Sequence, residues 1–187
     1  MFTATDALTR PPHRILVAGV SGAGKTTLAV RIAAITGSRH TEIDALYHGP
    51  NWTPRDSFLH DVTAFTDAPA WVTEWQYPSA RELLAERADT VIWLDLPTSV
   101  SLLRVVTRTL RRRRERTVLW NGNREPSLHT VLVNRDHIIR WMLRTRHSLK
   151  TLVPAAAREH PHLQVVRLRS QRQVEIWLRR LASAPAP

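Results

Sequence analysis

Five short apolar runs in the sequence have the length and composition of buried β-strands. Each is rich in β-branched or aromatic residues and is bounded by glycine, proline or polar residues, a pattern typical of strands covered on both faces. The predicted strands span 14–18, 40–43, 70–75, 90–94 and 163–168. The second strand is predicted to end at Asp44, and the fourth is followed by Asp95-Leu96-Pro97.

Segments with a helical spacing of apolar residues separate these strands. Gly37 is placed to stop the first helix, and Ser170-x-x-Gln173 is a capping-box pattern that opens the last one. Thr53-Pro54 resembles an N-cap followed by proline in the first turn of a helix. The predicted helices span 25–36, 54–66, 79–87, a long segment after Pro97, 127–149 and a segment beginning at 170. Strands that alternate with helices predict an α/β fold with a parallel sheet flanked by helices.

The long helix after Pro97 is predicted to use a single apolar stripe. Val100, Leu103, Val106 and Leu110 recur at helical spacing and are expected to face the core. The sequence Asn121-Gly122-Asn123 is expected to end this segment.

Length and composition favour one domain. The 187 residues are 43% apolar, enough to form a core, and we expect flexible tails at 1–12 and 183–187. The chain has no cysteine, which excludes a disulfide scaffold and a thiolate metal site. No apolar run approaches the roughly 20 residues that span a bilayer, and the first residues lack a signal-peptide core, so a cytoplasmic protein without membrane attachment is expected.

The formal charge of +11 is concentrated in one segment. Residues 104–146 contain 12 arginines but only three acidic residues, whereas the rest of the chain is nearly neutral. A solvated helix face is the ordinary explanation of a charge run, but this imbalance favours an anionic partner. Arg104, Arg108, Arg111 and Arg112 would share one helical face.

Residues 19–26, GVSGAGKT, fit the phosphate-loop pattern G-x-x-x-x-G-K-[ST]. A predicted strand precedes the pattern and a predicted helix follows it, as a phosphate loop requires. Glycines let backbone N–H groups point inward as an anion nest, and the helix N-terminus adds its positive dipole end. Lys25 would bind the β- and γ-phosphates of ATP, and the Thr26 hydroxyl would bind Mg²⁺. The predicted nucleotide-binding residues are Gly19, Ser21, Gly22, Ala23, Gly24, Lys25, Thr26 and Thr27.

Two acidic residues end apolar strands and are candidates for the second Mg²⁺ ligand. Glu74 ends the run WVTE and Asp95 ends VIWLD, and an acid at such a strand end reaches the metal beside the loop. Asp95 also has a simpler interpretation as the cap of the following helix, and Glu74 as a surface acid at a strand terminus.

From the loop onward, the chain resembles the nucleotide kinases of the adenylate-kinase-like P-loop group, and within it the small bacterial topology modulation proteins. The resemblance rests on GVSGAGKTT at 19–27, TEIDALYHGPNWTP at 41–54, VTEWQYPSA at 72–80, TVIWLDLP at 90–97, LWNGNRE at 119–125 and RLRSQRQVEIWL at 167–178. It implies a five-stranded parallel sheet in the order 2-3-1-4-5 and an Arg-rich helical lid over 104–146. It also implies that the loop after strand five lies near the adenine.

The resemblance implies roles for particular side chains. Glu74 stands where the group has its Mg²⁺-facing acid, although relatives often have Asp-Gly where this chain has Glu74-Trp75. Asp44 matches the acid that lies near the acceptor hydroxyl; as a turn residue it would need no such role. The lid arginines that would clamp phosphates are Arg108, Arg112, Arg116 and Arg124.

These observations predict an ATP- and Mg²⁺-dependent phosphotransferase that acts on an unidentified small acceptor. The alternatives are an ATPase that binds nucleic acid through the arginine segment, and an ATPase that switches a protein partner. Trp52, Trp75 and Trp120 either stack on a base or pack beneath loops, and His160 and His162 are expected to be solvated. The sequence leaves open whether the protein is a monomer or a homodimer.

Overall fold

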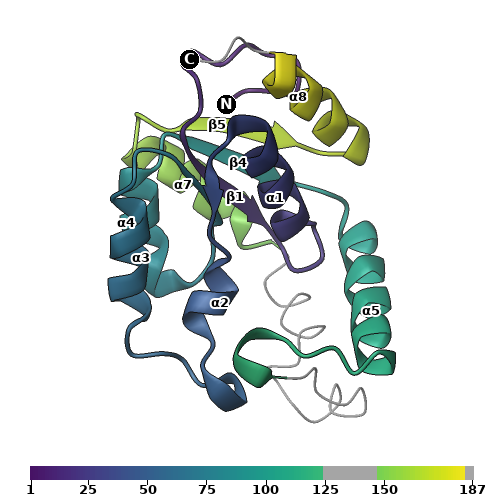
Figure 1. Ribbon diagram of the computed structural model, residues 1–187. Helices are drawn as coiled ribbons and strands as arrows, with labels where there is room; N and C mark the ends of the chain where they lie inside the picture. The colour runs from purple at the N-terminus through teal and green to yellow at the C-terminus, as the bar shows by residue number, and fades with distance from the viewer. Residues whose placement is uncertain (124–146, 184–187) are drawn as a thin grey trace.

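Strand β1 (Arg14–Gly19) lies at the centre of a five-stranded sheet. The computed structural model describes residues 1–123 and 147–183, and its strand order is β2-β3-β1-β4-β5 (Figure 1). The other strands are β2 (Arg39–His40), β3 (Trp71–Glu74), β4 (Thr90–Leu94) and β5 (Gln164–Leu168). Every neighbouring pair is parallel, so the carboxyl ends of the strands meet at one edge. The predicted fold class and strand order are confirmed.

Helices cover both faces of the sheet (Figure 1). On one face lie α1 (Lys25–Thr36) and α8 (Gln171–Ser183), and on the other α3 (Phe58–Thr66), α4 (Pro78–Arg87) and α7 (Leu149–Glu159). The remaining elements are α2 (Ile43–Tyr47), η1 (Pro50–Trp52), α5 (Thr98–Arg114) and η2 (Trp120–Gly122). None of the helices in the described ranges has the length and apolar character needed to cross a bilayer.

The two cores follow from the alternation of side chains along β1. Ile15 and Val17 pack with α1 and α8, whereas Leu16 and Ala18 pack with the helices of the opposite face. All four side chains are fully buried, as expected for the central strand of a two-faced sheet.

The predicted second strand is too long. It ends at His40, and Ile43 and Asp44 begin helix α2 instead of continuing the strand. The backbone N–H of Thr41 still donates to Val72 O at 2.9 Å, but the Ile43 N–H turns to the Glu74 carboxylate. A side-chain acceptor on the neighbouring strand therefore ends the ladder and starts a helix.

The predicted start of helix α3 is also wrong, because that helix begins at Phe58 rather than near Thr53-Pro54. Thr53 and Pro54 instead return toward the preceding loop. The Gly49 N–H donates to Thr53 O at 2.7 Å, and Pro54 forms a β-bridge with His48.

Helix α5 does not bury its predicted stripe. Val100, Leu103 and Leu110 are exposed, and the buried residues are Ser101, Val105 and Thr109. The buried face contacts the phosphate loop: a Cβ at Gly22 would lie 2.3 Å from Ser101 O and 2.6 Å from Val105 Cγ2. Close backbone packing against a glycine, rather than apolar periodicity, sets the orientation of the helix.

The chain ends differ from expectation as well. Residues 1–12, predicted to be a flexible tail, lie along β5: Phe2 bridges Val166, and the Thr9 N–H donates to Gln164 Oε1 at 2.8 Å. Helix α8 extends to Ser183, and residues 184–187 lie outside the described residues. The predicted helix 127–149 falls almost entirely outside them too, and α7, which follows it, was not predicted.

Candidate active site

The phosphate loop joins β1 to α1 at the carboxyl edge of the sheet. The helix begins at Lys25, as predicted, and two glycines before it adopt left-handed backbone, Gly22 at φ 80° and Gly24 at φ 98°. Glycine adopts this conformation without steric cost, which allows the tight wrapping of the loop. Gly22, Ala23, Gly24 and Thr27 line a cavity of about 530 Å³ that extends from this loop.

Lys25 lies within an electrostatic cluster. Burial lowers the pKa of Lys25, Asp44 and Glu74 oppose this effect by raising it, and Arg108 lowers it further. Both acids are therefore close enough to the ammonium group to influence its charge. The structure brings together three residues that are far apart in sequence.

Glu74 is 1% exposed, and its carboxylate is held by several donors. Its Oε2 accepts from the Ile43 N–H at 3.1 Å, and its Oε1 lies 3.2 Å from His40 Nε2. Burial alone would raise the pKa of Glu74, but the hydrogen bonds from His40, Ile43 and the Thr26 side chain together lower it. An ionised carboxylate beside the Thr26 hydroxyl is a pair of hard oxygen donors, which fits Mg²⁺.

The competing acid, Asp95, has a different environment. Its Oδ2 accepts from Arg167 Nε at 2.9 Å, and the Arg167 guanidinium also stacks over the Trp93 ring. Helix α5 begins at Thr98 without a side-chain cap, so Asp95 is not its N-cap. Asp95 is neutralised by an arginine from β5, whereas Glu74 adjoins the phosphate loop.

Asp44 lies in the first turn of α2, not at a strand end. Its Oδ1 accepts hydrogen bonds from the Gln76 side-chain amide and, at 2.5 Å, from the Tyr77 hydroxyl. The Tyr77 oxygen also lies 3.0 Å from His48 Nε2. Sequence reasoning missed Gln76, Tyr77 and His48; their only sequence signal is their presence in the motifs that carry the family resemblance.

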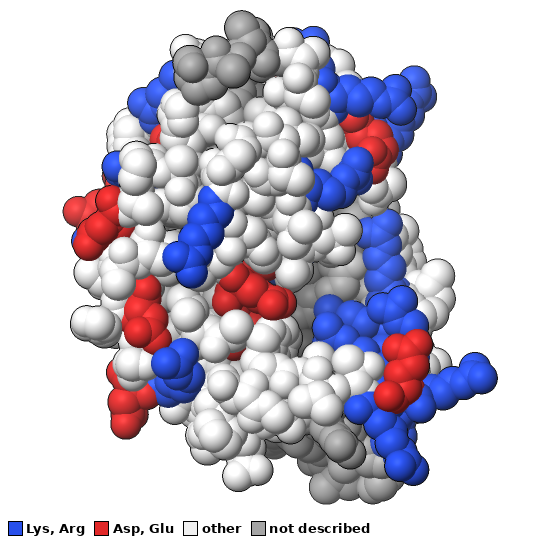
Figure 2. All heavy atoms as spheres, viewed as in Figure 1, with Lys and Arg blue, Asp and Glu red and all other residues white. Residues whose placement is uncertain are grey.

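The arginine-rich helix α5 borders the same cavity. Arg104, Arg108 and Arg111 line it, as the predicted shared face requires, together with Arg31 and Gln171. Arg104 bridges two elements, since Nη1 donates to Ala23 O at 3.3 Å and Nη2 to Gln171 Oε1 at 3.1 Å. Figure 2 shows basic side chains gathered along α5 beside a hollow in the surface.

The other predicted lid arginines that the structure describes are not among the residues that line the cavity. Arg112 is on α5, and Arg116 is exposed in the turn after the helix, at φ 49°. Arg124 lies outside the described residues.

The loop after α2 and the segment after α5 are joined beside Asp44. The buried Asn123 donates from Nδ2 to Gly49 O at 2.8 Å and accepts from the Trp52 N–H at 3.0 Å. The His48 ring stacks on Trp120 with centroids 5.9 Å apart. Trp52 and Trp120 thus pack against one another and against His48, and Trp75 is buried in the core.

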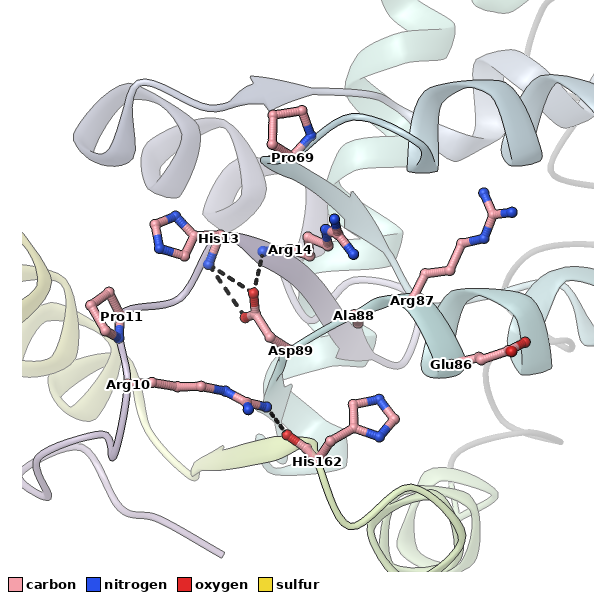
Figure 3. A pocket seen from close by; sticks show the side chains of 10 residues that line it. All are labelled: Arg10, Pro11, His13, Arg14, Pro69, Glu86, Arg87, Ala88, Asp89 and His162. Carbon is pink, nitrogen blue, oxygen red and sulfur yellow. Dashed lines mark hydrogen bonds between the residues drawn. The ribbon is translucent and has the colours of Figure 1, made fainter. Parts of the chain in front are cut away.

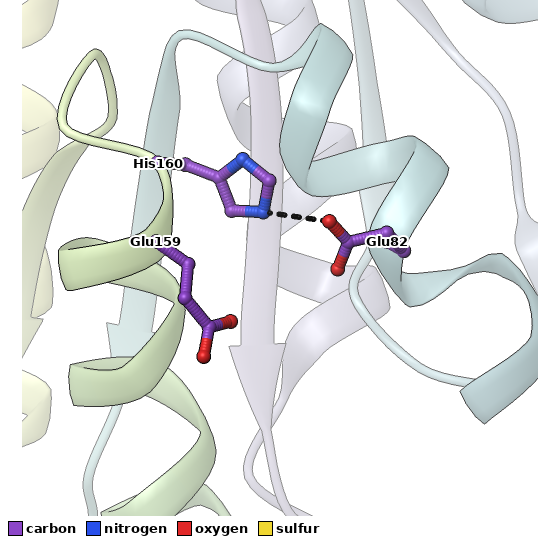
Figure 4. A group of neighbouring side chains, drawn as sticks. All are labelled: Glu82, Glu159 and His160. Carbon is purple, nitrogen blue, oxygen red and sulfur yellow. Dashed lines mark ion pairs between the residues drawn. The ribbon is translucent and has the colours of Figure 1, made fainter.

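Two further polar features lie at the opposite, amino edge of the sheet. A cavity of about 600 Å³ lies there. Two of its charged groups are engaged: Asp89 accepts from the His13 and Arg14 N–H groups, and Arg10 donates to His162 O (Figure 3). His160, expected to be solvated, has a side chain only 11% exposed and pairs with Glu82 at 3.2 Å, with Glu159 close by (Figure 4). Neither feature adjoins the phosphate loop.

The central strand, the glycine loop and the 2-3-1-4-5 order define the P-loop NTPase fold. Solved structures that share it include two kinases. Shikimate kinase from Acinetobacter baumannii, in complex with shikimate, is 16% identical with a TM-score of 0.53 over 90% of both chains. A sugar kinase from Janibacter sp., unliganded, is 24% identical with a TM-score of 0.51 over 94% of this chain and 98% of that one.

At these identities the likeness shows the fold. No protein-family model matches the sequence, and no curated protein matches it significantly. The resemblance to topology modulation proteins therefore stays a prediction.

Proposed function

We propose that this protein is an ATP- and Mg²⁺-dependent phosphotransferase that transfers the γ-phosphoryl group to a hydroxyl of a small acceptor. The observation that carries the proposal is the convergence of both acids on Lys25. The Glu74 carboxylate accepts from the N–H of Ile43, the residue before Asp44, at 3.1 Å, and both acids raise the pKa of Lys25. A loop suited to phosphate, a carboxylate suited to a metal and an acid suited to a hydroxyl group therefore lie at one edge of the sheet.

The residues around the loop suit a bound nucleoside triphosphate. Arg104, Arg108 and Arg111 supply positive charge along the cavity, and Lys25 begins α1 directly after Gly24, which also lines the cavity. Thr26 and Glu74 would hold Mg²⁺, which when bound neutralises phosphate charge. Gln171 also lines the cavity and belongs to the segment 169–172, where the resemblance expects adenine.

The protein's own contribution would be positioning and charge stabilisation. Lys25 and the cavity arginines would bind the phosphates, and Asp44 would orient the acceptor hydroxyl and accept its proton. Solved proteins of the same fold include shikimate and sugar kinases, which supports a small hydroxylated acceptor.

The direct test is a screen with γ-labelled ATP and Mg²⁺ against mononucleotides, nucleosides, sugars and shikimate. We expect label in at least one acceptor. ATP hydrolysis without labelling of any acceptor would contradict the kinase proposal and favour an ATPase.

One observation favours a second function, nucleic-acid binding. Arg113, Arg114 and Arg116 are exposed and are not among the residues that line the nucleotide cavity, so they supply charge that the phosphates do not use. The test is duplex binding across a salt series, comparing the wild type with a triple alanine variant at these positions. A steep fall of log affinity with log salt that the variant reduces would support it, and a flat slope would exclude it.

A further inference from the structure

The Tyr77 hydroxyl lies between two groups that come from a different part of the chain. Its oxygen is 2.5 Å from Asp44 Oδ1 and 3.0 Å from His48 Nε2. Asp44 is in α2, His48 follows α2 directly, and Tyr77 directly precedes α4. The three polar groups form one hydrogen-bonded chain beside the phosphate loop.

The chemistry of the three groups fixes the direction of this chain. A carboxylate only accepts, and a tyrosine has a single hydroxyl proton, so Tyr77 donates to Asp44. With Tyr77 donating to Asp44, we expect His48 Nε2 to carry a proton and donate to the Tyr77 oxygen, which leaves the buried His48 Nδ1 without a hydrogen-bond partner among the described residues. Burial lowers the pKa of His48, with Asp44 and the Trp52 backbone opposing, and the neutral imidazole is favoured. Burial together with Asp44 raises the pKa of Tyr77, and the protonated phenol is favoured.

The chain leaves one oxygen of Asp44 open. Tyr77 and the Gln76 amide both donate to Oδ1, whereas no group of the described residues donates to Oδ2. Two donors on one oxygen hold the carboxylate in a single orientation and keep the other oxygen available as an acceptor.

The surrounding structure holds Tyr77 in place. Its backbone has φ 59°, a conformation that non-glycine residues adopt at a cost and that is characteristic of functional sites. Its ring stacks on Tyr47 with centroids 3.8 Å apart, and Phe58 packs edge-on at 5.4 Å. On the other side, His48 is held against Trp120.

We infer that Tyr77 is a positioning residue, backed by His48, which fixes Asp44 so that Oδ2 accepts the proton of the acceptor hydroxyl; this role rests on the proposed kinase function. In the step, the acceptor O–H bond breaks while its oxygen bonds to the γ-phosphorus. The bond from that phosphorus to the β–γ bridging oxygen breaks and releases ADP. The proton goes to Asp44 Oδ2, and Tyr77 and His48 keep their protons.

The hydrogen-bond direction can be tested without any activity. In ¹⁵N-histidine-labelled protein, long-range ¹H–¹⁵N spectra report which ring nitrogen carries the proton, and the His48→Gln spectrum identifies the His48 signals. We expect the Nε2–H tautomer, and we expect Tyr77→Phe to shift these signals. An Nδ1–H tautomer would overturn the inference, because Tyr77 would then donate to His48 and not to Asp44.

The kinetic test uses γ-labelled ATP with the acceptor that the screen labels. Tyr77→Phe keeps the stacked ring and should lower kcat about tenfold to a hundredfold while the KM for ATP changes little. Tyr47→Phe is the matched control, since the Tyr47 hydroxyl bonds no described residue and its loss should leave kcat nearly unchanged. His48→Gln retains a donor and should keep more activity than His48→Leu.

The outcomes separate this inference from the proposed function. If no acceptor is labelled, the kinase proposal fails, while the tautomer still decides the orientation of Asp44. If an acceptor is labelled but Tyr77→Phe and Tyr47→Phe behave alike, the positioning role is wrong and the kinase proposal stands.

Discussion

The backbone N–H of Ile43 donates to Glu74 Oε2 at 3.1 Å, so the helix that carries Asp44 begins on the carboxylate of Glu74. One hydrogen bond therefore links the candidate metal ligand at the end of β3 with the candidate acid in α2. A change at Glu74 is expected to affect both the metal site and the position of Asp44.

Glu74→Gln should weaken Mg²⁺-dependent ATP binding by about tenfold or more, because the amide lacks the charge that attracts the cation. The matched variant is Asp95→Asn, which removes the ion pair with Arg167 and should cost about 1–3 kcal/mol in free energy of unfolding. It should leave Mg²⁺ dependence intact. Calorimetric titration of ATP at several Mg²⁺ concentrations measures the difference, and the reverse pattern would assign the metal to Asp95.

Lys25→Met should abolish tight ATP binding without lowering the free energy of unfolding. Burial lowers the pKa of Lys25, which means that its charge is unfavourable in the folded protein when no phosphate is bound. Replacing it with an apolar side chain removes that cost. The control is Lys150→Met, the other lysine, which is exposed on α7. Binding of a fluorescent ATP analogue and urea unfolding test both parts; normal binding by Lys25→Met would contradict the loop assignment.

Gly22→Ala should destabilise the fold by about 2 kcal/mol or more. The new Cβ would lie 2.3 Å from Ser101 O, at a backbone φ of 80°. Gly37→Ala is the matched control, since Gly37 also has positive φ but has no atom within 4 Å of its Cβ position. It should cost only about 1 kcal/mol of backbone strain. Equal losses in urea unfolding would show that α5 does not press on the phosphate loop.

The protein should lose stability as the pH falls below about 6.5, in part because of His48. Burial lowers the pKa of His48, so the folded protein binds fewer protons there than the unfolded chain, and stability rises with pH. Its contribution is present above the ordinary histidine pKa and is lost on acidification. Comparing urea midpoints near pH 8 and pH 5.5, we expect a smaller drop for His48→Gln than for wild type. His60→Gln, at an exposed histidine, should behave like wild type.

Several features of the fold and of the candidate site could be predicted from the sequence because they depend on local chemistry. The glycine loop, Lys25 and the α1 boundaries at Lys25 and Gly37 were readable because they depend on backbone conformation within a few residues. The strand order followed from the family resemblance. β4 was predicted with its observed bounds because its apolar run is closed on both sides by polar residues or proline.

Which side chains come into contact depends on how distant elements pack together. Asp44 was predicted at a strand end, but its position depends on Ile43 finding an acceptor on β3, a contact that no local pattern encodes. Tyr77 and His48 are 29 residues apart, and their common contact exists because α2 and α4 enter the same edge of the sheet.

The orientation of helix α5 is a second feature that no local sequence pattern encodes. From the sequence we predicted a long helix after Pro97 with arginines on one side; the observed helix ends at Arg114, before the expected stop at Asn121-Gly122-Asn123. Apolar spacing then predicted Leu103 and Leu110 inside, yet Ser101 and Val105 are buried, because Gly22 offers a surface without a side chain that a helix backbone can approach. Periodicity indicates which face of the helix is apolar, whereas the shape of the neighbouring loop selects the face that packs. That packing places Arg104, Arg108 and Arg111 along the cavity beside the phosphate loop.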